Sequence, residues 1–320
     1  MKRRRLGSSN LQVPEISLGC MGMSEFYGRA DECESLRTIH TAINLGINFL
    51  DTADMYGRGA NEELVGKAIR GKRDGLLIAT KFGIVRQDGG KRRDGRPEYV
   101  RQACESSLRR LNIETIDLYY LHRLDPETPI EDTVGAMSDL VRQGNVRFLG
   151  LSKVEPEILL RAHAVHPIAA LQMEYSLWAR EVEREVLATC RKNDIALVAY
   201  SPLGKGFLGG GVQSLDGLAE DDWRRRDPRF QGDNLESNLQ RLSALKKLAE
   251  SKGCTTGQLS LAWILHQGED IIALPGMRRV SRLYENIRAG SIALSREDLA
   301  AIDRVMPGFK SSEMRGSQKS

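Results

Sequence analysis

The sequence has few cysteines, and their placement suits neither disulfides nor zinc. They are Cys20, Cys33, Cys104, Cys190 and Cys254. An odd number without a short spacing argues against a disulfide framework and against a zinc site, so we predict no metal. A chain of 320 residues can bury enough surface to fold without either kind of cross-link. We therefore expect reduced thiols in a cytoplasmic protein.

Long apolar runs and a charge excess are also missing. No apolar run approaches the ~20 residues of a membrane helix, and the basic residues 1–5 precede no secretory apolar segment. The formal net charge is only +4, with both signs interspersed. We therefore predict no nucleic-acid partner and no membrane partner. Residues 1–5 could form a nuclear or RNA-binding patch, but a hairpin strand that returns through residues 11–13 is the favoured interpretation.

Short apolar runs alternate with amphipathic segments along most of the chain. We predict strands at residues 15–20, 48–53, 76–81, 116–122, 146–152, 169–175, 196–202 and 271–275. We predict helices near residues 34–45, 61–71, 97–111, 130–143, 156–165, 182–193, 237–267 (with a break at Gly253), 279–289 and 296–305. Eight β–α units at intervals of ~30 residues predict an α/β fold, the (β/α)8 TIM barrel.

The barrel is predicted to be one domain, residues 1–309, with an N-terminal β-hairpin and extra C-terminal helices and loops. Residues 310–320 are expected to form a disordered tail. Two connections, residues 86–96 and 204–234, are too long to be simple turns. Long loops in compact domains are usually functional or mobile.

Reactive side chains follow three consecutive strands. Asp51 ends the apolar run 47–50, and Tyr56 follows in a glycine-rich turn before a helix. Lys81 and His122 end the next two strands. Because the carboxyl ends of parallel strands share one face of a barrel, these four side chains are predicted to meet there as a catalytic group. Any one of them alone could be a solvated loop residue or a packing residue.

The four types suit the reduction of a carbonyl by hydride. The developing alkoxide needs a proton, and Tyr56 can supply it as a general acid. A phenol has an ordinary pKa near ~10, which a neighbouring ammonium such as Lys81 lowers. At ~4 Å and an effective dielectric of ~20 that attraction is worth at most about 4 kcal/mol. Asp51 would keep Lys81 charged, and His122 could hydrogen-bond the substrate oxygen.

With its flanking segments 18–23 and 174–178, this tetrad resembles the aldo-keto reductases, especially a microbial and plant branch with pyridoxal reductase-like and auxin-induced-type members. The resemblance covers nearly the whole chain. It implies a (β/α)8 barrel that uses NADPH, less often NADH, to reduce aldehydes or ketones and to oxidise secondary alcohols in reverse.

One segment matches the residue spacing of a Rossmann cofactor-binding fingerprint but lacks the structural context of that fingerprint. Residues 204–209 read G-x-G-x-x-G after a strand, but no helix opens there, so we reject that interpretation. The resemblance instead implies that this loop approaches the cofactor's pyrophosphate. It implies the following contacts with the nicotinamide and the pyrophosphate: Gly19, Cys20, Met21, Asp51, Ser152, Gln172, Tyr200, Ser201, Leu203 and Gly206. Among them Tyr200 would stack on the ring, while Ser152 and Gln172 would hold the carboxamide.

The adenosine end would lie where the last strand leads into a helix. By resemblance its contacts are Gly276, Arg278, Arg282, Glu285 and Asn286, with Arg282 on the 2′-phosphate. Two residues depart from the family pattern. Met277 stands where Thr or Ser is common, and Lys153 stands where Asn or Glu is common.

Two other classes of function compete with a reductase. Potassium channel β-subunits resemble the same family and act as cofactor-binding redox sensors or partners. An unrelated hydrolytic barrel would need a metal cluster or a carboxylate pair. The sequence does not specify the substrate, the preferred direction of the reaction or the oligomeric state, and it is compatible with a monomer. Trp178, Phe82 and Met23 could form an apolar substrate wall or belong to the core.

Overall fold

The computed structural model describes residues 1–28, 30–87, 90–212, 214–220 and 222–307. In these ranges eight parallel strands form one sheet, in the order β3, β4, β5, β8, β9, β10, β11, β12. Their bounds are Leu18–Gly19, Phe49–Asp51, Leu77–Phe82, Ile116–Leu121, Val146–Ser152, Ile168–Glu174, Ala196–Tyr200 and Ile271–Leu274. The predicted tail, residues 310–320, lies outside the described residues.

The sheet closes on itself between its first and last strands. Isolated parallel bridges join Ile16 to Ala273 and Gly19 to Gly276, and the Ser17 amide donates to the Ala273 carbonyl at 2.9 Å. A Cβ at Gly19 would lie 3.3 Å from the Pro275 carbonyl oxygen, so glycine suits this close approach. The predicted (β/α)8 barrel is thereby confirmed, although β3 is shorter than the predicted strand 15–20.

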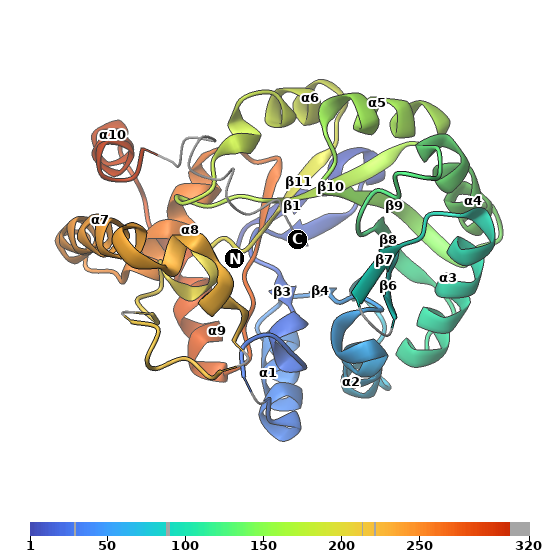
Figure 1. Cartoon of the computed structure of the whole chain (residues 1–320), viewed down its shortest axis with the longest axis horizontal. Helices are drawn as coiled ribbons and strands as arrows, with labels where there is room; N and C mark the ends of the chain where they lie inside the picture. The colour runs from blue at the N-terminus through green and yellow to red at the C-terminus, as the bar shows by residue number, and fades with distance from the viewer. Residues whose placement is uncertain (29, 88–89, 213, 221, 308–320) are drawn as a thin grey trace.

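The helices surround the strands (Figure 1). From α1 to α10 their bounds are Glu32–Asn44, Ala60–Ile69, Pro97–Leu111, Ile130–Arg142, Pro156–Val165, Val186–Lys192, Gly232–Ser251, Thr256–His266, Val280–Ile287 and Arg296–Val305. Side-chain caps begin several of them, and α8 starts with a capping box between Thr255 and Gln258. Such caps satisfy the free amides at a helix start, which fixes where the helix begins.

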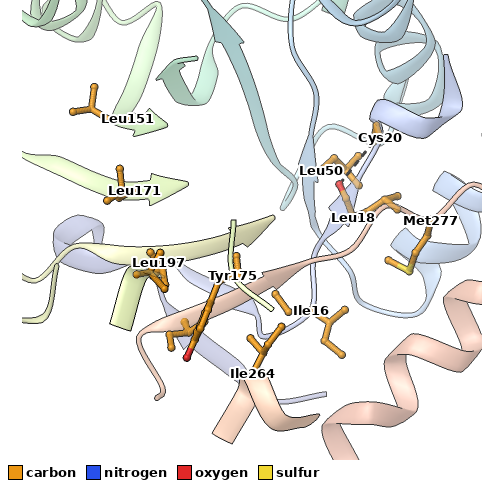
Figure 2. Close-up of a cluster of buried hydrophobic side chains, with 14 of the residues drawn as sticks. Ile16, Leu18, Cys20, Leu50, Leu151, Leu171, Tyr175, Leu197, Ile264 and Met277 are labelled. Atoms are coloured by element: carbon orange, nitrogen blue, oxygen red, sulfur yellow. Dashed lines mark hydrogen bonds between the residues drawn. The ribbon is translucent and has the colours of Figure 1, made fainter. Parts of the chain in front are cut away.

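Apolar side chains fill two layers. Leu151, Leu171 and Leu197, from neighbouring strands, belong to the buried cluster that Figure 2 shows. Each buried leucine contributes roughly 1.5–3 kcal/mol of transfer free energy. A second cluster includes Phe49 and Val198. Together they bury both faces of the strands, as expected of a parallel sheet.

The N-terminal segment forms the predicted hairpin. Strands β1 (Arg3–Arg5) and β2 (Gln12–Pro14) pair antiparallel. Leu6 is fully buried, in the same cluster as Phe49. Arg4 is buried too, and it donates to the carbonyls of Ile271 at 2.5 Å and Leu265 at 2.7 Å. The basic run therefore anchors the hairpin to the barrel, in agreement with the favoured interpretation.

Both long connections carry structure. The first contains an antiparallel hairpin of β6 (Ile84–Gln87) and β7 (Gly90–Arg93). The second contains the 3-10 turns η5 (Gly204–Gly206), η6 (Trp223–Arg226) and η7 (Pro228–Phe230), and α7 begins at Gly232 rather than near residue 237. In the part of the chain that the structure describes, no helix combines the length and apolar character needed to cross a bilayer.

Candidate active site

Four predicted side chains meet at the carboxyl ends of neighbouring strands. Asp51 is the last residue of β4, Lys81 lies near the end of β5, and His122 directly follows β8. Tyr56 opens the 3-10 turn η3 (Tyr56–Gly59). All four are buried, from 0% exposed for Lys81 to 7% for Tyr56. The structure therefore assembles the group predicted from the sequence.

Lys81 is the centre of this group. Its ammonium donates to a carboxylate oxygen of Asp51, to the Thr52 carbonyl at 2.7 Å and to the Tyr56 hydroxyl at 3.4 Å. The other Asp51 oxygen accepts from Gln172 Nε2 at 2.8 Å. An ammonium has three protons, and the three acceptors use all of them. A buried charge is tolerated when it is paired and hydrogen-bonded in this way.

The turn that carries Tyr56 is fixed by buried polar contacts. Thr52 donates to the side-chain oxygen of Asn61 at 2.6 Å, and Asn61 Nδ2 donates to the Cys20 carbonyl at 2.9 Å. Gly57 and Arg58 have φ angles of 56° and 55°, so the chain reverses within the turn. Tyr56 directly precedes this reversal, and its hydroxyl lies 3.4 Å from Nζ of Lys81 near the end of β5.

Charge and burial act against each other on Tyr56. Burial raises the pKa of Tyr56, while the charge of Lys81 and its hydrogen bond lower it, and burial prevails. The predicted effect of Lys81 is therefore present, but the net pKa lies above that of a free phenol. Burial also opposes the charge of Lys81, yet Asp51 and Tyr56 together raise the pKa of the ammonium.

His122 faces Tyr56 as a neutral imidazole. The two ring centroids lie 5.7 Å apart with an edge-to-face angle of 85°. Burial, followed by the charges of Lys81 and Arg123, lowers the pKa of His122 well below its ordinary value. Its Nδ1 atom is buried and has no hydrogen-bond partner among the described residues. Unpaired buried polar atoms are costly, so this nitrogen is suited to a ligand.

The predicted nicotinamide-side residues lie on the next strands. Ser152 ends β9 beside Gln172 of β10, and the two are register partners. Ser152 accepts from Arg123 Nη1 at 3.2 Å. Tyr200 ends β11, and its buried hydroxyl finds no partner in the described ranges. An unsatisfied hydroxyl, a serine and an amide thus lie on consecutive strands.

Tight turns carry the remaining predicted contacts on this side. The Gly204 amide donates to Ser201 at 2.9 Å, and the Gly206 amide donates to Leu203 at 3.0 Å. Ser201 itself has a φ of 49°. On the first strand Gly19 is followed by Cys20, which is buried, and by Met21 at the start of η2 (Met21–Met23). Burial raises the pKa of Cys20 to about 12, so this thiol is not a nucleophile.

The predicted adenosine-end residues follow β12. Gly276 bridges to Gly19, and Asn286 is buried in α9. Arg278 donates to the Tyr27 carbonyl at 2.6 Å. Arg282 is 53% exposed in its side chain and pairs with Glu285 at 2.6 Å.

An acid stands at the same helix start. Glu34 of α1 accepts a hydrogen bond from the Val280 amide, the first residue of α9, at 3.3 Å. Met277 is buried. The predicted adenosine end therefore combines its arginines with two acids, Glu285 and Glu34. The sequence pattern did not reveal Glu34 because it is far away in the chain.

Other neighbours of the tetrad were also missed. Phe26, Met55 and Ile84 pack around Tyr56. The residues considered for an apolar wall, Trp178, Phe82 and Met23, are instead buried in the core.

Arg123 was also missed by the sequence analysis. Its position directly after His122 could have indicated that it lies at the site.

Among the described residues no group of three or more His, Cys, Asp or Glu side chains could hold a metal ion.

Comparisons with known proteins agree with this geometry. A model of the aldo/keto reductase family matches residues 15–307. A glycerol dehydrogenase from Gluconobacter oxydans has 32% sequence identity with a TM-score of 0.87, over 95% of this chain and 94% of that one.

Two further structures are of the same kind. An aldo-keto reductase from Bacillus halodurans, described as a holo form, has 28% identity and a TM-score of 0.79, over 96% of each chain. An aldo/keto reductase from Klebsiella pneumoniae, in complex with NADP and acetate, has 28% identity and a TM-score of 0.75, over 97% of each chain.

Proposed function

The chain belongs to the aldo/keto reductase family, and on this basis we propose that it is an NADP-linked oxidoreductase that reduces aldehydes or ketones to alcohols. The observation that carries the proposal is the buried contact of Lys81 with both Tyr56 and Asp51. A buried phenol beside a fixed ammonium is a general acid of the kind that carbonyl reduction needs. The same arrangement oxidises an alcohol in reverse.

The described residues fit a nicotinamide cofactor. Tyr200 offers an aromatic face and an unpartnered hydroxyl among the described groups. Gln172 uses its amide nitrogen on Asp51, so its amide oxygen remains as the acceptor for a carboxamide N–H. We propose that Ser152 is the second carboxamide contact and that Arg282 binds the 2′-phosphate. A bound NADPH would supply the hydride.

The roles of this chain's own residues follow from their positions. Tyr56 gives its hydroxyl proton to the carbonyl oxygen, and Lys81 stabilises the phenolate that remains. Asp51 holds the ammonium in place. Neutral His122 donates a hydrogen bond to the same oxygen, which favours the charge that develops there. The apolar group of Phe26, Met55 and Ile84 keeps water away from Tyr56.

An activity screen tests this proposal. Purified protein is assayed for NADPH and NADH oxidation with aldehydes, ketones and quinones, and for NADP⁺ reduction with secondary alcohols. We expect turnover of at least one carbonyl class with NADPH. Tight cofactor binding without turnover of any substrate would contradict the proposal and would favour a sensor or partner role.

A further inference from the structure

Most cations around the tetrad are paired with carboxylates. Lys81 pairs with Asp51. In the loop after β11, Lys205 pairs with Asp227, and Arg229 pairs with both Asp227 and Glu174. Each of these acids is therefore already engaged. Among the described residues no carboxylate pairs with Arg123 or Lys153, which follow the ends of adjacent strands β8 and β9. Lys91 of β7 also lacks a carboxylate partner there, but it lies over the ring of Phe26, at 5.6 Å from the centroid.

Arg123 is half-buried beside His122. Its Nη1 atom donates to the His122 carbonyl and to Ser152 Oγ at 3.2 Å. In the described part of the chain it has no carboxylate partner, and both of these hydrogen bonds use the same nitrogen. A guanidinium has five N–H donors in a planar fork that matches a carboxylate or a phosphate. Most of its donor capacity is therefore available for an anion.

Lys153 directly follows Ser152 in the chain. Its φ angle is 54°, a left-handed conformation that is uncommon for a lysine. Its Nζ atom lies 5.4 Å from the centroid of the Tyr200 ring, and no acid within the described ranges pairs with it. Backbone strain of this kind concentrates at binding and catalytic sites. Here it places an exposed ammonium over the ring proposed to face the nicotinamide.

An independent observation also indicates a ligand at this place. Nδ1 of His122 is buried without a partner in the described residues, and His122 is only 6% exposed. Burial is the main cause that lowers the pKa of His122, and the charges of Lys81, Arg123 and Lys153 lower it further. The site thus contains a neutral imidazole in a positive surrounding. An uncharged carbonyl gains little from two extra cations, whereas an anionic group gains from both.

We propose that Arg123 and Lys153 bind an anionic group of the substrate, so that the enzyme prefers carbonyl compounds that carry a carboxylate or a phosphate. The inference rests on the proposed function of the same site. The cofactor's diphosphate is a second source of negative charge. The substrate is favoured because both cations flank His122 and Ser152, whereas the loop proposed for the diphosphate follows β11.

A matched pair of aldehydes tests the preference. The probes are 4-carboxybenzaldehyde and its neutral methyl ester, methyl 4-formylbenzoate, which share the same reacting group. We expect the wild type to prefer the carboxylate by about tenfold in kcat/KM, as a charge-assisted contact allows. The preference should fall as salt is added, because part of the site is exposed.

Substitutions at Lys153 then locate the charge. Lys153→Asn removes the ammonium with a residue that tolerates the left-handed conformation, and it should reduce the preference about threefold to tenfold. Lys153→Glu should reverse the preference, so that kcat/KM for the carboxylate is lower than kcat/KM for the methyl ester. The control is Lys246→Met, which removes one positive charge from the exposed Lys246–Glu250 pair on α7 and should leave the preference unchanged.

Binding separates this inference from the proposed function. Calorimetric titration of 4-(hydroxymethyl)benzoate and its methyl ester into NADP⁺-saturated protein measures the same preference without turnover. A preference for the carboxylate that Lys153→Glu abolishes supports the inference even if no aldehyde is reduced. Equal binding of the two alcohols by the wild type would overturn it. So would a Lys153→Glu variant that loses NADPH affinity while the preference remains.

Discussion

Lys81 connects the groups on which the proposed chemistry depends. Its ammonium contacts Asp51, the Thr52 carbonyl and Tyr56 in a fully buried position. Burial and, to a lesser extent, the charge of Asp51 raise the pKa of Tyr56, and Lys81 is the largest influence that lowers it. The lysine therefore determines how readily the phenol gives up its proton.

Replacing Lys81 should move the pH dependence of alcohol oxidation upward. Oxidation needs the phenolate form of Tyr56, and without Lys81 burial raises the pKa of Tyr56 further. Lys81→Met would also leave Asp51 buried without its cation. The double variant Lys81→Met with Asp51→Asn removes that complication. We expect both variants to reach half-maximal rate at higher pH than the wild type, and an unchanged profile would show that the two residues are uncoupled.

Glu34 should weaken the binding of NADPH. Its carboxylate accepts from the first amide of α9, two residues before Arg282, the residue proposed to bind the 2′-phosphate, and it also pairs with Arg37. An anion at a helix start is worth roughly 0.3–1 kcal/mol, and a second anion there is repelled by a similar amount. Glu34→Gln should therefore tighten NADPH about twofold to fivefold, with little change for NADH.

Fluorescence titration of both cofactors measures this effect. The control is Glu32→Gln, on the same helix, where the carboxylate pairs with Lys67 in an exposed position. Equal tightening of NADPH and NADH in Glu34→Gln would mean that Glu34 does not face the 2′-phosphate.

Among the elements, the loop between β11 and α7 has the densest ion pairing near the site. Asp227 accepts from Lys205 at 2.7 Å and from Arg229 at 2.8 Å, and it caps the turn η7. Lys205 also lies 3.9 Å from the ring centroid of Trp223. The Lys205–Asp227 pair thus connects three parts of the loop, the turns η5, η6 and η7.

Protonating or replacing Asp227 should loosen this loop. Burial alone would raise the pKa of Asp227, but Arg229 and Lys205 outweigh it and hold the pKa well below its usual range. The stabilisation is thus fully present above the unfolded-state pKa near ~3.9 and is lost as the pH falls through the lower folded pKa. At neutral pH, Asp227→Asn should speed hydrogen exchange in residues 204–231.

Hydrogen exchange in the same residues of Asp194→Asn serves as the control, because Asp194 forms only an exposed pair with Arg5. Unchanged exchange in Asp227→Asn would show that the ion pairs do not hold the loop.

Some elements could be predicted from the sequence and others could not. Strand β5 was predictable because it is buried at every position and begins with the apolar residues 77–79. The hairpin of β6 and β7 was not, because every residue of β7 is exposed and no apolar alternation marks it. The tetrad was predictable because each member lies at or shortly after the carboxyl end of a strand. The roles proposed for Arg123 and Lys153 were not, because the lack of a counter-ion depends on the tertiary structure.

In the whole molecule, the N-terminal hairpin ties the start of the chain to the end of the barrel. Arg4 contacts carbonyls at the end of α8 and at the start of β12 and lies 3.4 Å from Glu15, whereas Arg5 forms a pair that is about half exposed. Adjacent arginines thus differ in burial and in number of partners. The comparison isolates the contribution of the buried one to stability.

Arg4→Met should lower the free energy of unfolding by about 3–5 kcal/mol, because it leaves Glu15 buried without its cation. Arg5→Met should change it by only about 0–1 kcal/mol, since exposed pairs are screened. Urea denaturation of both variants measures the difference. Similar losses in the two variants would contradict the anchoring role of Arg4.

The most direct test of the account is the turnover of Tyr56→Phe. The change removes only the hydroxyl, so the barrel and NADPH binding should survive, and NADPH fluorescence titration checks both cofactor affinity and fold. Loss of general acid catalysis should lower kcat for carbonyl reduction by roughly 10² to 10⁴-fold. A variant that binds NADPH normally and keeps near wild-type turnover would show that Tyr56 is not the proton donor.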